Sequence, residues 1–280
     1  KTIALVKEKY KALVIYNEGE NFSVGANVGL ALFAANIAAW AQVEAMIATG
    51  QDMMQKLKYA PFPVVAAPAG MALGGGCEFL LHSDAVQAHS ETYAGLVECG
   101  IGLLPGWGGC KEMLGRWATD PNMPHGPMPA SMKVFEMIST AKVARSAAEA
   151  RDMNILRRGD AVTMNRYRLL ADAKAKALSL VDGYKPQEKR EIVLPGPSGK
   201  VALDQAVDGF AKLRVATKHD VVVGGELATV LTGGATDIID TVKESAILDL
   251  EREGFLRLLK TPATLARIEH MLETGRPLRN

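Results

Sequence analysis

Two glutamates of this sequence stand beside glycine-rich stretches, and both could move protons in a reaction. Glu78 follows three consecutive glycines, Gly74 to Gly76, and Glu98 lies in GLVECGIGLLPGWGG (95–109), which holds six glycines. Glycines at the start of a helix let another group approach the backbone and leave the first N–H groups of the helix free. With the positive end of the helix dipole, these N–H groups suit an oxygen that carries negative charge. The pattern therefore indicates an active site.

A purely structural turn is the alternative interpretation of the first glycine cluster, because three glycines before an acid also occur in ordinary turns. The second stretch, 95–109, favours a site, since a loop with so many glycines costs chain entropy unless a ligand needs the close approach. A third glycine segment, FSVGANV (22–28), follows the apolar run ALVIY (12–16) and supplies another backbone N–H. We therefore expect the three glycine segments to act together.

The overall composition is that of an ordinary globular protein. Of the 280 residues, 48% are hydrophobic and 22% are charged, and the net charge is +1. This balance does not call for nucleic acid or an anionic membrane surface as a partner. The length suits one large domain, or one domain with a helical appendage. No apolar run approaches the ~20 residues that a membrane-spanning helix needs.

Cysteine usage indicates a reducing compartment. The three cysteines, Cys77, Cys99 and Cys110, are odd in number, and none belongs to a CxxC pair. This argues against a disulfide framework and against a zinc site. We therefore expect a cytoplasmic protein without a bound metal.

Alternating apolar patterns predict an α/β protein. Residues 1–9 are expected to form an amphipathic helix with Ile3, Leu5 and Val6 turned inward, and 12–16 a buried strand. The next expected elements are two helices within 29–60, a buried strand at 63–69, a helix at 75–82, a strand at 85–89 and a helix that begins near Gly108. Strands that alternate with glycine loops and helices are typical of an α/β layered domain.

The second half of the chain has a mostly helical pattern. A Pro/Met-rich loop at 120–129 precedes a helix at 131–140, and Ser146 with Glu149 forms a capping box before a short helix. We expect a core domain at residues 1–165 and a helical C-terminal region at 166–280 that serves as a cap or assembly element.

Together, the three glycine segments resemble the crotonase (enoyl-CoA hydratase/isomerase) superfamily. The family pattern F-x-x-G-A-D is similar to Phe22–Asn27, with Asn27 in place of the usual aspartate. The pattern G-x-A-x-G-G-G-C-E matches Gly70–Glu78, and E-x-x-x-G-x-x-P-G-x-G-G matches Glu98–Gly109. The resemblance runs from about residue 8 to 165. It implies a crotonase-like (ββα)n superhelix core with a largely helical C-terminal region, and family strands that would precede Lys1.

The resemblance also implies a chemistry. Such enzymes bind an acyl-CoA thioester and stabilise the enolate that forms at its carbonyl, here by the backbone N–H groups of Ala26 and Gly75. In hydratases of the family, both glutamates hold one water. Glu78 would then be the base that activates the water toward C3, Glu98 the acid that protonates C2, and the Gly106 N–H would orient the pair. Two carboxylates close together in a partly dry site should not both stay ionised.

Substrate contacts are expected at Asn27, Val28 and Gly29. A neutral amide at Asn27 can still fix its loop, although the exchange can alter contacts to acyl-CoA. Trp107 lies inside the second glycine loop. It either walls the acyl pocket or packs in the interior, and the sequence does not decide between these roles.

The C-terminal segments, among them GFLRLLKTPATLARIEHMLETGRPLRN (254–280), look like the C-terminal region of bacterial 3-hydroxyacyl-CoA dehydrogenases that carry a crotonase domain. This implies a fragment of a bifunctional enzyme of fatty-acid β-oxidation. NAD would bind only the domain that precedes it, and these 280 residues would bind no cofactor, since coenzyme A belongs to the substrate. The alternatives are a Δ3,Δ2-enoyl-CoA isomerase and a non-catalytic acyl-CoA-binding or assembly domain. A homo-oligomer is left open.

Overall fold

The computed structural model describes residues 1–280, and the chain folds into two compact units that interleave along the sequence. The first unit comprises Lys1–Gly25, Gln51–Gly95 and Val143–Lys189. The second comprises Ala26–Gly50, Leu96–Lys142 and Arg190–Asn280. The expected division of the chain after residue 165 stays a prediction, because these units are defined by contacts and are discontinuous in sequence.

A parallel four-stranded sheet forms the centre of the first unit. Its strands lie in the order β1 (Leu13–Tyr16), β2 (Val64–Ala67), β4 (Ala85–His89), β6 (Ala161–Thr163). All four residues of β2 are buried, as expected for an apolar strand inside a parallel sheet. By contrast, β1 is only half-buried, although the sequence predicted a buried strand, because it lies at the edge of the sheet. Helix α8 (Leu169–Ser179) packs its small apolar side chains against β2 and β4.

A second, two-stranded parallel sheet of the first unit pairs β3 (Gly70–Leu73) with β5 (Thr92–Gly95). Neither strand was predicted from the sequence, which indicated only a glycine turn before the helix. The turn is confined to Gly74, and α4 (Gly75–Leu81) follows at once. Three further elements of the unit are α1 (Thr2–Lys9), α7 (Ala147–Asp152) and a short 3-10 helix (Arg166–Arg168). In α1 only Val6 is buried, and the expectation that Leu5 turns inward is wrong, since Leu5 is 44% exposed.

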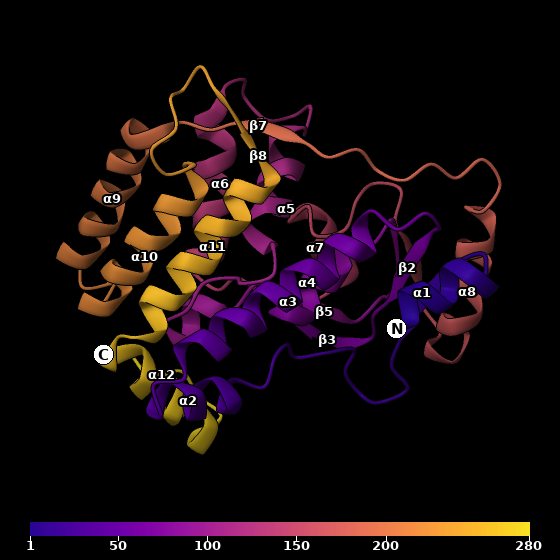
Figure 1. Cartoon of the computed structure of the whole chain (residues 1–280), viewed down its shortest axis with the longest axis horizontal. Helices are drawn as coiled ribbons and strands as arrows, with labels where there is room; N and C mark the ends of the chain where they lie inside the picture. Colours follow the sequence, from indigo (N-terminus) through magenta and orange to yellow (C-terminus); the bar gives the residue numbers. More distant parts are fainter. The chain divides into compact units, whose positions relative to one another are not determined.

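The second unit is mainly helical (Figure 1). It contains α2 (Val28–Asn36), a 3-10 helix (Glu98–Ile101), α5 (Gly109–Ala118), α6 (Pro127–Ser139), α9 (Gly196–Lys212), α10 (Lys218–Leu231), α11 (Glu244–Leu259), α12 (Pro262–Thr274) and the hairpin of β7 (Glu191–Val193) with β8 (Thr241–Lys243). Within this unit α10 lies between α9 and α11. Helix α3 (Trp40–Lys58) crosses the boundary of the two units at Gly50. The prediction of two helices within 29–60 is thus confirmed.

Helix α6 begins earlier than the sequence predicted. The expected helix at 131–140 starts at Pro127, where a proline is compatible with the first turn because that position needs no N–H donor. The predicted Ser146 cap is confirmed: the Ser146 hydroxyl accepts a hydrogen bond from the Glu149 N–H at 3.1 Å.

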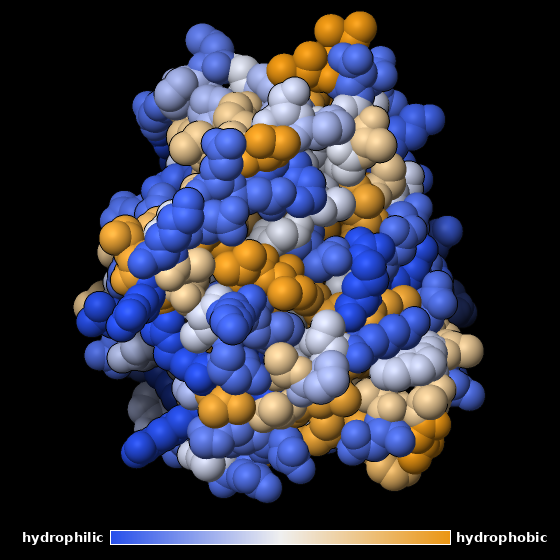
Figure 2. All heavy atoms as spheres, turned by 90° about the vertical axis from the view of Figure 1, so that its left-hand side faces the viewer, coloured by the Kyte–Doolittle hydropathy of each residue, from blue (hydrophilic) through white to orange (hydrophobic).

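The face over α9 is mostly hydrophilic and carries separate apolar spots (Figure 2). Val201, Phe210 and Leu213 are among the exposed apolar side chains of this region. Scattered exposed apolar residues are normal for a protein surface. None of the helices combines the length and the apolar character needed to cross a membrane.

Candidate active site

The glycine segment around Ser23 and Gly25 meets the glycine cluster before Glu78 inside the first unit. Ser23 forms an isolated bridge to β3, and its C=O accepts a hydrogen bond from the Leu73 N–H at 2.9 Å. This pairing brings Gly25 against the start of α4. A Cβ placed on Gly25 would lie 3.1 Å from the backbone nitrogen of Gly75, and Gly25 has a φ of +92°. Glycine is therefore required where the chain leaves this contact.

The Gly74–Gly76 run is also packed too tightly for side chains. A Cβ on Gly76 would lie 2.1 Å from the carbonyl oxygen of Ser23. Gly74 has a φ of +55° and a ψ of −125°, and its N–H donates to the C=O of Gly95 at 2.9 Å. The three glycines thus fix the path of the backbone from β3 into α4.

Gly75 is the first residue of α4, and its N–H donates no hydrogen bond within the chain. The first N–H groups of a helix have no intrahelical acceptor, and the helix dipole favours negative charge beside them. Glu78 lies one turn further along α4 and is 2% exposed. The expected backbone donor and the expected base therefore belong to the same helix.

Helix α2 of the second unit begins with Val28 and Gly29, directly after Ala26 and Asn27. Asn27 is the N-cap, and its side-chain oxygen accepts a hydrogen bond from the Gly29 N–H at 3.0 Å. An amide oxygen does this as well as the carboxylate that the family uses here. The Ala26 N–H, like that of Gly75, donates no hydrogen bond within the chain. The expectation that a neutral amide can fix this loop is confirmed.

Glu98 opens the 3-10 helix Glu98–Ile101 and is half-buried. The turn ends at Gly102, whose φ is +79°, and the Leu103 N–H donates a hydrogen bond to the C=O of Glu98 at 3.0 Å. Burial and the negative charge of Glu98 raise the pKa of the neighbouring Cys99 thiol far above its usual range. Cys99 is therefore a neutral thiol at physiological pH and not a nucleophile.

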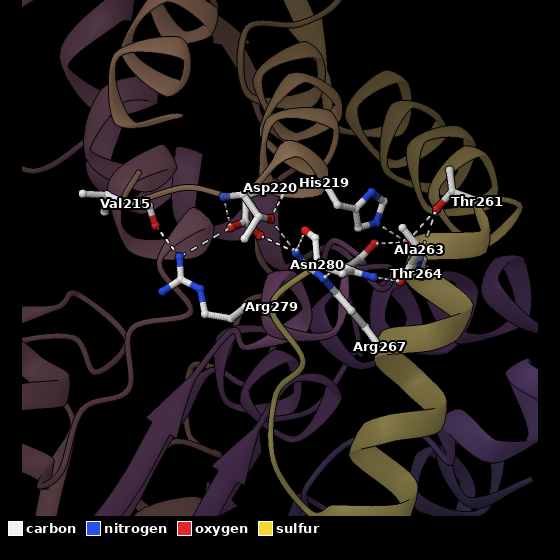
Figure 3. Close-up of polar contacts among 11 residues, drawn as sticks. Val215, His219, Asp220, Thr261, Ala263, Thr264, Arg267, Arg279 and Asn280 are labelled. Carbon is white, nitrogen blue, oxygen red and sulfur yellow. Dashed lines mark hydrogen bonds and ion pairs between the residues drawn. The ribbon is translucent and has the colours of Figure 1, made fainter. Parts of the chain in front are cut away.

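Two distant residues hold the end of this turn (Figure 3). The Thr264 hydroxyl of α12 donates to the C=O of Gly102 at 2.8 Å, and the Nε2 of His219 lies 2.8 Å from the same hydroxyl. Because the hydroxyl proton is used on Gly102, the imidazole must donate through Nε2–H. A Cβ on Gly102 would come within 2.9 Å of the Thr264 oxygen, so the fit requires glycine.

A buried arginine completes this network. The Arg267 guanidinium, 2% exposed as a side chain, contacts Asp220 at 2.8 Å, the side-chain oxygen of Asn280 at 2.7 Å and the Thr217 hydroxyl at 3.0 Å (Figure 3). Although burial acts to raise the pKa of Asp220, hydrogen bonds from Thr217 and Arg267 hold it below its usual range. Burial and the charge of Arg267 lower the pKa of His219, against the opposing effect of Asp220.

The second glycine loop packs against helices of its own unit. A Cβ on Gly50 would lie 2.0 Å from the Nε1 of Trp107, so the indole lies directly on α3. Gly106 and Gly108 are buried, and Gly108 is the N-cap of α5 with a φ of +106°. This contact supports a packing role for Trp107, and its role as a wall of the acyl pocket stays a prediction.

The structure distributes the expected site residues between the two units. Gly75 and Glu78 belong to the first unit, and Ala26, Asn27, Val28, Gly29, Glu98, Gly106 and Trp107 belong to the second. The sequence did not indicate His219 and Thr264, which reach Gly102 from more than a hundred positions away. No group of three histidine, cysteine, aspartate or glutamate side chains is arranged to hold a metal ion.

Residues 4–119 match the family model described as enoyl-CoA hydratase/isomerase. The matched residues include the three glycine segments, and the match confirms the predicted resemblance of this part of the chain to the crotonase family. The fold agrees: an enoyl-CoA hydratase from Bacillus halodurans superposes with a TM-score of 0.61 over 95% of this chain and 86% of that chain, at 15% identity. The predicted crotonase-like α/β fold is confirmed.

Two longer curated proteins are similar in sequence. A Bacillus subtilis protein named "Probable 3-hydroxyacyl-CoA dehydrogenase" is 43% identical over 98% of this chain and 34% of its own length. A Rickettsia prowazekii protein whose name includes the words "fatty acid oxidation complex trifunctional enzyme" is 31% identical over 92% of this chain and 33% of its own length. The chain thus spans about a third of the length of these relatives.

Proposed function

We propose that the chain hydrates trans-2-enoyl-CoA thioesters to 3-hydroxyacyl-CoA in fatty-acid β-oxidation. One observation carries the proposal: the two glutamates of the family's hydratases, Glu78 and Glu98, are both present. The N–H groups of Gly75 and Ala26 support it, since neither donates a hydrogen bond within the chain. Isomerases and hydrolases of the superfamily often lack one of the acids.

The proposed oxyanion hole consists of the Gly75 and Ala26 N–H groups. Both would donate to the thioester oxygen, on which negative charge develops when C3 is attacked. Donors that are fixed before the reaction act on this charge without reorganising, and each is worth ~2.7–4 kcal/mol in other enzymes. The tight glycine contacts at Gly25 and Gly76 support such fixed geometry.

The two glutamates would add one water across the C2=C3 double bond. Glu78 takes a proton from the water while the water oxygen bonds to C3, and Glu98 gives its proton to C2 of the enolate. Since both carboxylates hold the same water, the oxygen and the proton reach the same face, which is a syn addition. The Gly106 N–H orients the water, and Asn27, Val28, Gly29 and Trp107 contribute to substrate binding.

The names of the longer relatives support a place beside an NAD-dependent 3-hydroxyacyl-CoA dehydrogenase. Such an activity oxidises the product of the hydration, so a shared polypeptide would pass one intermediate between two sites. NAD would then bind the other part of the protein and not these 280 residues. The three cysteines are buried and form no disulfide, which fits the reducing cytoplasm.

The test is crotonyl-CoA hydration, followed by loss of the ultraviolet absorbance of the conjugated thioester. For a hydratase, Glu78→Gln and Glu98→Gln should each lower kcat at least ~100-fold, as expected for loss of a general acid or base. For the alternative Δ3,Δ2-enoyl-CoA isomerase, loss of Glu78 should matter far less. A binding or assembly domain would retain acyl-CoA but show no turnover before any substitution. Unchanged hydration in both variants contradicts the proposal.

A further inference from the structure

The second glycine loop is held by a helix that lies outside the residues matched by the family model. Glu251 of α11 is fully buried, and its carboxylate accepts two backbone hydrogen bonds. One comes from the Gly108 N–H at 2.7 Å, and the other comes from the Lys111 N–H at 3.0 Å. Both donors lie at the N-terminus of α5, where N–H groups have no intrahelical acceptor. A single carboxylate thus caps α5 from another helix.

The same face of α11 contacts the loop at two further points. A Cβ on Gly106 would lie 3.2 Å from the Cδ2 of Phe255, and a Cβ on Gly254 would lie 2.9 Å from the Cδ2 of Leu104. Glu251, Gly254 and Phe255 are spaced three and four residues apart, so they share one helical face. This face therefore follows the loop from Leu104 to Gly108.

Charge also ties α11 to the first turn of α5. The buried ammonium of Lys111 pairs with Glu112 and lies 3.6 Å from the carboxylate of Glu244, the first residue of α11. Negative charge on Glu251 is stabilised by the donors and the dipole of the α5 N-terminus. The contact between α11 and α5 therefore includes paired polar groups, and these pairs fix how the two helices align.

We propose that Glu251 is a positioning residue for the loop that carries Gly106 and Trp107. The inference rests on the proposed hydratase function, in which the Gly106 N–H orients the water. Because Gly108 is held by Glu251 and Gly106 is packed on Phe255, loss of the carboxylate frees the loop at one of its two supports. Two buried N–H groups then have no acceptor, and the loop must shift or admit water.

The test compares Glu251→Ala and Glu251→Gln with Glu253→Ala. Glu253 lies on the same helix, but its side chain is 59% exposed and pairs with Arg257, so it is a matched control. Amide hydrogen exchange at Gly108 and Lys111 reports the two hydrogen bonds directly. We expect exchange at both amides to accelerate in Glu251→Ala and less in Glu251→Gln, which keeps one acceptor oxygen. The control should exchange as the unmodified chain does.

The kinetic part follows kcat and KM for crotonyl-CoA. Glu251→Ala should lower kcat about 10- to 100-fold, since a displacement of about 1 Å can cost that much, with a smaller loss in Glu251→Gln. If Glu251→Ala does not fold, the glutamine variant carries both measurements. Unchanged exchange at Gly108 and Lys111, or a loss of thermal stability with kcat unchanged, overturns the inference. Absence of hydration by the unmodified chain would instead overturn the proposed function, and the exchange measurement would still decide whether Glu251 holds the loop.

Discussion

At the residue scale, the candidate site depends on backbone N–H groups that have no acceptor within the chain. Gly75 is such a residue because it begins α4, and Ala26, which directly precedes the N-cap of α2, is another. Asn27, the N-cap of α2, follows Ala26 directly. Its side chain satisfies the Gly29 N–H and so fixes where the helix begins.

Asn27→Ala should destabilise the protein by about 1 kcal/mol, because the cap hydrogen bond is lost. Asn27→Asp should leave the free energy of unfolding nearly unchanged, since a carboxylate accepts the same bond. Denaturant unfolding measures both values. Equal destabilisation by the two substitutions would show that the cap does not hold this loop.

At the element scale, α10 and α12 support the turn that begins at Glu98. The Thr264 hydroxyl donates to the C=O of Gly102, and His219 of α10 bonds the same hydroxyl. Arg267 joins α12 to the start of α10 through Asp220. His219 is the titratable member of this chain of contacts near neutral pH. Its pKa is lowered, chiefly by burial and then by Arg267.

This network predicts a pH dependence of stability. A histidine with a lowered pKa is neutral in the folded state, so the unfolded chain binds its proton first as the pH falls below about 6.5. The free energy of unfolding should therefore fall between pH 7 and pH 5, at no more than about 1.4 kcal/mol per pH unit from this one group. Asp220, whose pKa is also lowered, contributes stability above about pH 4 and loses it only below that range.

Denaturant unfolding from pH 5 to 8 checks this prediction. His219→Gln should flatten the slope between pH 5 and 7, whereas His125→Gln, in an exposed loop, should leave it unchanged. If both variants keep the slope of the unmodified chain, His219 is not the titrating group.

The elements were predicted unevenly, for identifiable reasons. The helices α4 and α5 and the strands β2 and β4 carry apolar or glycine-marked patterns and were predicted close to their observed bounds, whereas α2 and α3 were predicted only as two helices within 29–60. Strands β3 and β5 were missed because each has only four residues, contains glycine and includes exposed side chains. Their pairing with each other, and the bridge to Ser23, depends on contacts that no local pattern contains.

The candidate site shows the same limit. Glu78, Glu98 and the glycines were predicted because three short segments, Phe22–Asn27, Gly70–Glu78 and Glu98–Gly109, resemble family motifs. The glycine stretch 95–109 is held from more than a hundred positions away, by Glu251 at Gly108 and by Thr264 at Gly102, with His219 bonded to Thr264. Each of these three residues stands in an ordinary helical pattern. A single sequence without a tertiary contact map offers no signal for them.

At the scale of the whole molecule, the two glutamates belong to different compact units. Glu78 lies in the first unit and Glu98 in the second, and one unit boundary, Gly25 to Ala26, falls inside the glycine segment 22–28. In the proposed hydration, the two carboxylates must act on one water. This requirement makes a prediction that the single variants cannot test.

The double variant Glu78→Gln/Glu98→Gln, measured beside both single variants in crotonyl-CoA hydration, tests the central claim most directly. Groups that act as one unit lose their effect together, so removal of either disables both. We predict that kcat of the double variant lies within about tenfold of the slower single variant. Losses that multiply, so that the double variant falls by the product of the two single effects, would contradict the account, because the glutamates would then act independently.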